Sequence, residues 1–253
     1  AAEVRRGLLL TAGFTAPGRR PGTPFSTYGV AGLLFWPGTG KGGGMPETLF
    51  PYPGVLPETT STGGALFTAG GIFSAVELRA MEMDGLMRRV YGETYVRWDI
   101  SPDPVCRALA AAACLPPKQR PRIMLGRLTA AWVYGCAPPP ARLALLVDHG
   151  RRITALAPFS PAVLHEVRLG PADGMDIAGI RVSTPLRTAS DLARHGPEEE
   201  SLPALLALAA DPALHCPLGH VRAITAAAPR LPGKAAALDR LDRAIALSHR
   251  PGG

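Results

Sequence analysis

The sequence predicts an α+β protein, with an N-terminal winged helix-turn-helix followed by a mixed α/β domain that has a small sheet and a helical C-terminal tail. Two observations lead to this prediction. The stretch between 73 and 96 has the pattern of a capped helix and a tight basic hairpin, and strand patterns gather between 142 and 182, ahead of amphipathic helices. We expect residues 1–64 to be disordered or an upstream extension, 65–100 the winged-helix domain, 101–122 a helix and linker, and 123–253 the α/β domain.

The winged-helix prediction starts from a capping box. Ser74, followed three residues later by Glu77, predicts a helix start, and an Asp-Gly pair ends this helix. Leu86–Tyr91 and Thr94–Val96 then have the pattern of two strands that flank the two-residue turn Gly92-Glu93. A helix followed by a basic hairpin is the outline of a winged helix, a fold that mostly docks on duplex DNA.

The remaining elements follow from caps, turn residues and alternation. An Ala-rich stretch predicts one helix, and Thr184 followed by Pro185 predicts the start of another. The Asp148-His149-Gly150 turn signal predicts a hairpin between the strands on its two sides. We expect helices at 105–115, 128–134, from 185, 202–210, 218–227 and 234–247, and strands at 142–147, 152–156, 163–169 and 176–182, which form a small mixed sheet backed by helices.

Charge is distributed unevenly along a chain with a formal net charge of +7. Residues 45–100 hold four bases and seven acids, a balance of −3, which counts against a strongly DNA-binding module. The four cysteines form neither a CxxC pair nor a metal-ligand spacing, so we expect reduced thiols and a cytoplasmic protein. The apolar run 28–36 is too short to span a membrane, and we expect no membrane partner.

Three segments in order carry a family resemblance: 73–96, Arg127–Gly135 with the strand that follows it, and Gly179–Arg194. Together they resemble the AbiEi-like antitoxins and transcriptional regulators of bacterial type IV toxin–antitoxin systems. The resemblance implies a winged helix and a C-terminal α/β domain in a DNA-binding antitoxin that represses its own operon. It also implies operator DNA and a nucleotidyltransferase-like toxin as partners, with no enzymatic activity and no cofactor.

Basic side chains are the candidate DNA-binding residues. Arg88 and Arg89 lie at the start of the expected wing, where bases usually meet phosphate, although solvated charges on a hairpin would give the same pattern. Arg187 and Asp191 share a helix face, and we interpret them as a structural ion pair. The complete predicted set is Arg79, Arg88, Arg89, Arg97, Lys118, Arg120 and Arg122, with no catalytic and no metal-binding residue.

Two alternatives stay open beside the DNA-binding hypothesis. The first is a protein-interaction module that neutralises a nucleotidyltransferase-like toxin without specific DNA binding, which the acidic balance of residues 45–100 suits better. The second is a metal-dependent nuclease, which the absence of converging carboxylates and lysine disfavours. The stretch between Met81 and Arg88 is short and acidic, so the recognition helix is expected to be abbreviated. A homo-oligomer is possible on any of these interpretations.

Overall fold

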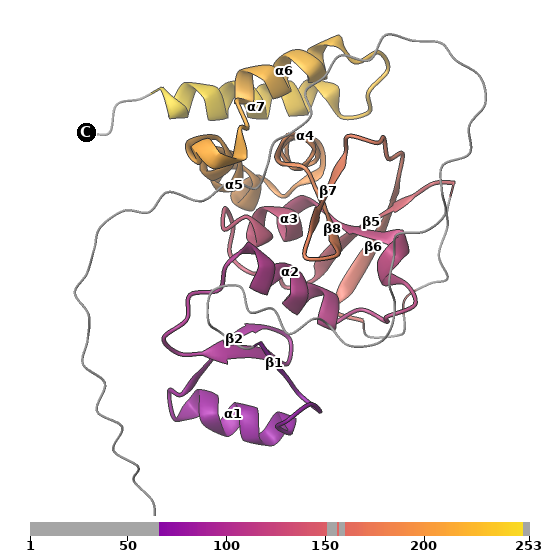
Figure 1. The fold of residues 1–253 in the computed structure, drawn as a ribbon. Helices are drawn as coiled ribbons and strands as arrows, with labels where there is room; N and C mark the ends of the chain where they lie inside the picture. The colour runs from indigo at the N-terminus through magenta and orange to yellow at the C-terminus, as the bar shows by residue number, and fades with distance from the viewer. Residues whose placement is uncertain (1–65, 151–155, 157–159, 250–253) are drawn as a thin grey trace, which may run out of the picture. The chain divides into compact units, whose positions relative to one another are not determined.

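The computed structural model describes residues 66–150, 156 and 160–249, all within one compact unit (Figure 1). The expected extension at 1–64 lies outside the described residues. The described part is a mixed α/β structure with two small sheets and several helices, as the sequence predicts.

The first described segment is a strand–helix–hairpin module, residues 66–100. It contains β1 (Phe67–Thr68), α1 (Ala75–Met83), β2 (Met87–Tyr91) and β3 (Thr94–Arg97). The strands form an antiparallel sheet in the order β1-β3-β2. The predicted hairpin is therefore confirmed.

The predicted capping box at the start of α1 is present in full. Ser74 Oγ accepts a hydrogen bond from the Glu77 N–H at 3.3 Å, and the Glu77 carboxylate accepts one from the Ser74 N–H at 2.8 Å. Two donors that the first helical turn leaves unpaired are satisfied in this way. Asp84 caps the other end, and Gly85, at φ +71°, turns the chain back toward β2.

A five-stranded mixed sheet forms the centre of the second part of the chain, in the order β6-β5-β4-β8-β7. Its middle strand, β4, runs antiparallel to β5 and parallel to β8, while β5 runs parallel to β6. The sequence analysis missed β4, because three buried residues give no measurable alternation. The strands are β4 (Ile123–Leu125), β5 (Leu143–Asp148), β6 (Ala162–Val167), β7 (Gly174–Ile177) and β8 (Ile180–Ser183).

Two strand predictions need correction. The expected hairpin between 142–147 and 152–156 is not formed, because β4 and β6 occupy both edges of β5; residues 152–155 themselves lie outside the described residues. The expected single strand 176–182 is instead the hairpin β7–β8. Ala178 and Gly179, at φ +51° and +79°, make its turn, and positive φ at both central residues is typical of a type I′ turn.

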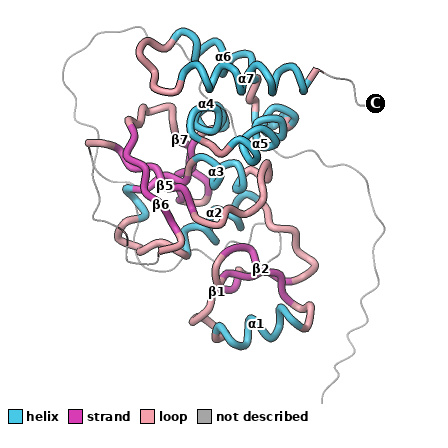
Figure 2. The backbone as a smooth tube through the Cα atoms, turned by 180° about the vertical axis from the view of Figure 1, so that it is seen from behind, coloured by secondary structure: helices cyan, strands magenta, loops and turns pink. Residues whose placement is uncertain are grey.

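Helices cover one face of this sheet and continue beyond it. α2 and α3 lie on the same face, and α4 packs on α3 and on the three helices that follow (Figures 1 and 2). The helix predicted at 202–210 begins four residues earlier, since three glutamates in its first turn are favoured by the helix dipole. The bounds are α2 (Pro104–Ala113), α3 (Arg127–Val133), α4 (Pro185–His195), α5 (Glu198–Ala210), α6 (Leu218–Ala227) and α7 (Lys234–Ser248).

Two arginines fix the helical layer. Arg187 on α4 donates to Asp191 at 2.9 Å and to Asp173 at 2.6 Å, which confirms the predicted pair and adds a second carboxylate. Arg240 on α7 donates to three carbonyls at the end of α4, those of Leu192, Ala193 and Gly196. The Leu192 carbonyl also accepts from the Gly196 N–H, and the last carbonyls of a helix otherwise lack partners within it, so Arg240 caps α4 from a distant helix.

No single helix among the described residues is long and apolar enough to cross a membrane. α5 followed by the segment 212–227 meets the length and composition together, but the two are bent by 85°. The buried face of α5, which includes Leu205 and Leu208, belongs to the protein core.

Gly126, which joins β4 to α3, has no room for a side chain. A Cβ atom at this position would lie 2.5 Å from Cγ and Cδ1 of the buried Leu146, although the backbone there is extended at φ −141°. We therefore expect Gly126→Ala to lower the free energy of unfolding by about 1–3 kcal/mol, the usual cost of overpacking. Urea denaturation followed by circular dichroism measures this change.

The matched control is Gly219→Ala in the first turn of α6, where nothing lies within 4 Å of the added Cβ. We expect this variant to keep or slightly raise stability, because alanine is the better helix former. Equal stability of the two variants would show that the junction at Gly126 is not tightly packed.

Candidate nucleic-acid interface

The seven predicted basic residues fall into two groups along the chain. Four arginines belong to the strand–helix–hairpin module, and the other three bases lie on the turn between α2 and β4. The module groups Arg79, Arg88, Arg89 and Arg97, and the turn carries Lys118, Arg120 and Arg122.

Two of the module arginines connect α1 to the hairpin. Arg79 donates to the Glu93 carboxylate at 2.5 Å, and the Tyr95 hydroxyl donates to the same carboxylate at 3.2 Å. Arg89 donates to Glu82 at 2.7 Å, and its guanidinium carbon lies 5.3 Å from the centre of the Tyr95 ring. Positive and negative groups alternate through this cluster, so it functions first as a clamp between helix and hairpin.

Electrostatics of the clamp favour its charged state. Hydrogen bonding to Arg79 holds the pKa of Glu93 below its usual value, with a smaller contribution from Tyr95. The same contact raises the pKa of Arg79, and the hydrogen bond to Glu82 raises that of Arg89. Both arginines are therefore already engaged before any ligand arrives.

Arg88 and Arg89, the predicted wing pair, point to opposite faces of the hairpin. Arg89 stands opposite Tyr95 and Arg88 opposite Val96, and successive strand residues alternate between faces. Arg88 is exposed and donates to the Trp98 carbonyl at 3.1 Å. The two side chains therefore do not form one patch, and only Arg88 lies outside the clamp.

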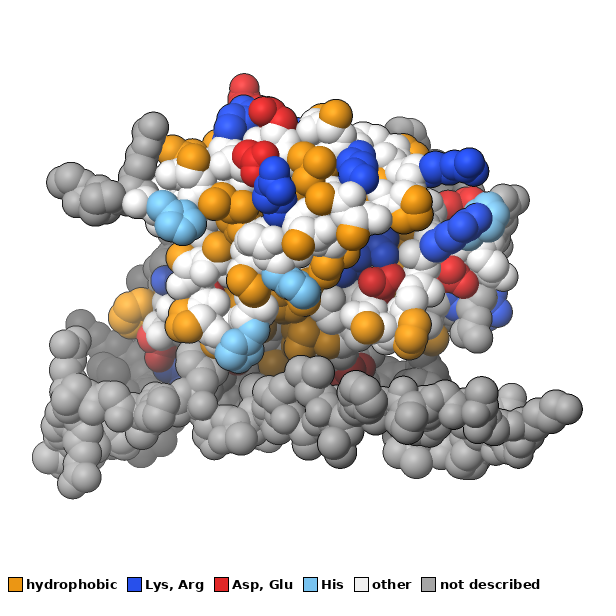
Figure 3. Space-filling view, turned by 90° about the horizontal axis from the view of Figure 1, so that it is seen from above, with side chains coloured by type: hydrophobic (Ala, Val, Ile, Leu, Met, Phe, Trp, Pro, Cys, Tyr) orange, Lys and Arg blue, Asp and Glu red, His pale blue; other side chains and the backbone are white. Residues whose placement is uncertain are grey.

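The other predicted bases differ in whether their side chains have hydrogen-bond partners. Arg97 donates to Asp99 at 2.7 Å, and Arg120 donates through Nε to the Leu115 carbonyl at 3.1 Å. Lys118 and Arg122 are exposed. On the α6–α7 side of the molecule, which Figure 3 shows, basic and acidic side chains are interspersed, so that side presents no field of a single sign.

Exposed apolar side chains gather on the same module, which the sequence analysis did not anticipate. Ile72, Val76 and Met83 are 84%, 77% and 87% exposed, and they follow each other at near-helical spacing along and just before α1. Leu86 and Trp98 of the same module are also exposed, and the Trp98 N–H donates to the Leu86 carbonyl. Exposed large apolar side chains that are concentrated on one small module favour a surface that binds a partner.

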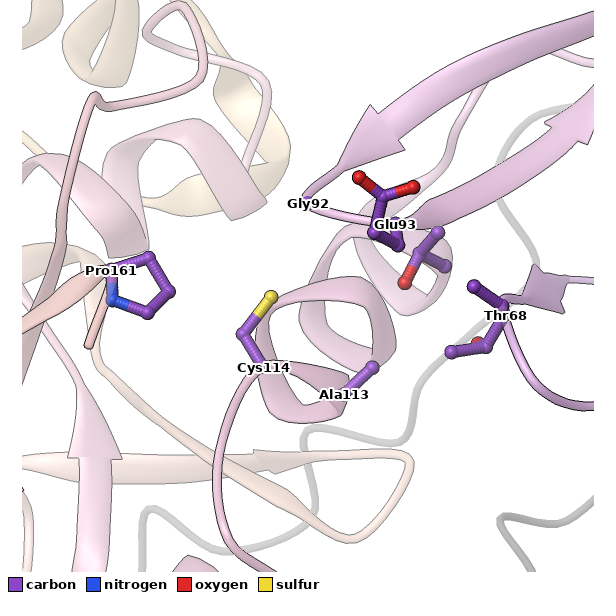
Figure 4. A pocket seen from close by; sticks show the side chains of 8 residues that line it. Thr68, Gly92, Glu93, Ala113, Cys114 and Pro161 are labelled. Atoms are coloured by element: carbon purple, nitrogen blue, oxygen red, sulfur yellow. The ribbon is translucent and has the colours of Figure 1, made fainter. Parts of the chain in front are cut away.

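A shallow hollow of about 420 Å³ lies where the hairpin turn meets the end of α2 (Figure 4). Thr68, Glu93, Cys114 and Pro161 contribute to its lining. Gly92 is required here, because a Cβ atom would lie 2.8 Å from Cys114 Sγ and φ is +54°. Burial raises the pKa of the Cys114 thiol, so the hollow offers no activated nucleophile.

The described residues contain no group of three or more histidine, cysteine or carboxylate side chains that could hold a metal ion. Asp173 and Asp176, which a nuclease would need near each other, have separate partners. Asp173 receives the guanidinium of Arg187, and Asp176 accepts from the Gly179 N–H inside the β7–β8 turn. Both carboxylates therefore have structural roles.

Comparison with known proteins assigns no family. No family model matches the chain, and no curated protein matches it. A solved structure of the RV2827C protein from Mycobacterium tuberculosis is similar over 70% of this chain, with 18% sequence identity and a TM-score of 0.39. The chain spans 66% of that protein, just under two thirds of its length.

Acidification should weaken the clamp between α1 and the hairpin. Because the folded-state pKa of Glu93 is lowered, its contribution to stability is present above the unfolded value of about 4.3 and is lost as pH falls through the lower folded value. At neutral pH, Glu93→Gln should mimic this loss. We expect several-fold faster hydrogen exchange of the α1 amides in this variant.

Glu200→Gln, an exposed carboxylate on α5, is the matched control and should leave exchange in α1 unchanged. Unchanged exchange in the Glu93→Gln variant as well would mean that the apolar contacts of Leu78 and Tyr95, and not the charges, hold α1 in place.

Proposed function

We propose that the chain is a non-enzymatic DNA-binding regulator and antitoxin of the AbiEi-like kind, with the strand–helix–hairpin module as its winged helix. The observation that carries the proposal is the order β1–α1–β2–β3 with the sheet order β1-β3-β2. A helix directly before a two-stranded wing is where a winged helix places the element that enters the major groove. Under this proposal α1, rather than the acidic stretch after it, is the recognition helix.

Electrostatics limit how strongly such a module can bind. Residues 66–100 carry four bases and five acids, and three of the bases are paired with carboxylates. These pairs lie at the surface, where ion pairs contribute little, so phosphate can replace the carboxylates. The displaced acids would still repel the DNA backbone. We therefore propose moderate, salt-sensitive binding with Arg88 as the main phosphate contact.

A second candidate function has its own observation. The exposed apolar side chains Ile72, Val76 and Met83 suit a protein partner better than a phosphate backbone. This favours a protein-interaction module that neutralises a nucleotidyltransferase-like toxin. The charged clamp would then serve only to hold α1 in position.

Arg88 and Arg89 provide a matched test of DNA binding. We expect Arg88→Ala to weaken binding to every duplex and to reduce the salt slope by about one. Arg89→Ala should instead loosen α1, because it removes the contact with Glu82. Fluorescence anisotropy with an upstream duplex and a random duplex, titrated with salt, measures the first effect, and hydrogen exchange measures the second.

Binding that is absent in the wild-type chain, or a salt slope that Arg88→Ala leaves unchanged, would contradict the DNA-binding proposal. The second candidate then becomes testable with the co-expressed product of the adjacent gene. A complex that survives nuclease treatment and is lost in the Val76→Asp, Met83→Asp variant would support it.

A further inference from the structure

Arg127, at the junction between β4 and α3, adopts a backbone conformation that its residue type rarely occupies. Its φ is +52°, in the left-handed region that favours glycine. Strain of this kind persists only where the surroundings impose it, and it is frequent at functional sites. The guanidinium reaches β6, where Nη1 lies 3.3 Å from Nε2 of His165.

The contact with Arg127 determines the protonation of His165. A guanidinium donates and cannot accept, so His165 Nε2 must be the acceptor and the ring proton must lie on Nδ1. The imidazole is therefore neutral. Burial, and next the charge of Arg127, lower the pKa of His165, in agreement with this geometry.

Arg127 has no carboxylate partner among the described residues. The nearby Asp191 is already held by Arg187, which takes Asp173 as well. Arg127 Nε is buried and has no hydrogen-bond partner in the described part of the chain. A half-buried cation that lacks a counter-ion is unfavourable, and an anion would relieve it.

His195 on α4 adds a second imidazole to this region. It interacts electrostatically with Arg127 and also with His165, and burial and the neighbouring arginines lower its pKa. Arg194, beside it, donates to the Pro232 carbonyl, a neutral acceptor that does not cancel the positive charge of the guanidinium. Among the described residues, Asp191 is the one carboxylate whose charge interacts with Arg127, His165 and His195 together. Its ion pair with Arg187 neutralises this charge.

We propose that Arg127 and His165 form a binding site for a phosphate-class oxyanion, with His195 as a neighbouring imidazole on α4. Such a ligand would accept hydrogen bonds from the free Arg127 donors, and the His165 imidazole would take up a proton to become a further donor. Arg194 on α4 adds positive potential, while Asp191 stays occupied by Arg187. This site is independent of the proposed DNA contact at Arg88.

The test follows the two imidazoles in the full chain, labelled with ¹⁵N-histidine. Inorganic phosphate is titrated against chloride at constant ionic strength. We expect saturable changes at His165 and His195 and a pKa of both that is higher in phosphate by about one pH unit. Arg127→Gln should abolish the saturable response.

Backbone strain supplies a matched control. Arg230 also has a left-handed backbone, with φ at +49°. Arg127→Gly and Arg230→Gly should each relieve backbone strain, so both variants should fold at least as well as the wild type. Only Arg127→Gly should lose the response to phosphate. A wild-type chain without a saturable response, or an Arg127→Gly variant that keeps it, would overturn the proposal.

Replacing inorganic phosphate by a short DNA duplex identifies the source of the group. Histidine changes at lower concentrations of duplex than of phosphate would assign the site to a backbone phosphodiester. Changes with inorganic phosphate alone would assign it to a free phosphate.

Discussion

Close packing of the Ala-rich helix α2 is the constraint on which the rest of the described structure depends. Its buried residues are Cys106, Leu109 and the alanines at 108 and 110–112, so the backbone can approach its neighbours on several sides. α2 contacts β2, α3 and β8, and Val90 and Val96 of the hairpin belong to the same buried cluster as its alanines. A larger side chain at these positions would separate the hairpin from the five-stranded sheet.

Burial of α2 explains why the hairpin is firmly held although its own sheet is small. Three short strands with one helix bury too little apolar surface to be stable alone. Tyr91 of β2 packs against Trp132 of α3, with ring centroids 5.3 Å apart, and adds an aromatic contact across the same boundary. A ligand bound at the hairpin would therefore act on an element that is continuous with the α/β core.

Arginine has a largely structural role in this chain. Arg187 and Arg240 fasten helices, while Arg79 and Arg89 fasten α1 to the hairpin. The formal net charge of +7 therefore overstates the positive field that is available to a partner. Two arginines differ from these fastening residues. Arg88 is exposed outside the clamp, and Arg127 is half-buried without a carboxylate of its own among the described residues.

Features that depend on neighbours in sequence were predictable. The Ser74 capping box, the Gly92-Glu93 hairpin and the Thr184 cap all form as their residue types indicate. Features that depend on distant partners were not. β4 is too short to show a pattern, and the pairing of β5 with β6 in place of 152–156 depends on tertiary contacts.

The β7–β8 turn was missed for a local reason, because Ala178 is not a residue type that signals positive φ. For the candidate interface, the sequence identified the basic residues but not their partners. Arg79 and Glu93 are fourteen positions apart, and Arg127 and His165 thirty-eight. Such contacts arise only when the fold brings separate elements together.

Native-state hydrogen exchange across increasing denaturant tests most directly whether α2 unites the two sheets. β3 and β4 are central strands of their respective sheets, so their slowest amides report the stability of each. If α2 couples the sheets, both sets of amides should converge on one unfolding free energy with the same dependence on denaturant. Opening of β3 at lower denaturant, with β4 still protected, would contradict the account and show the module to be a separate folding unit.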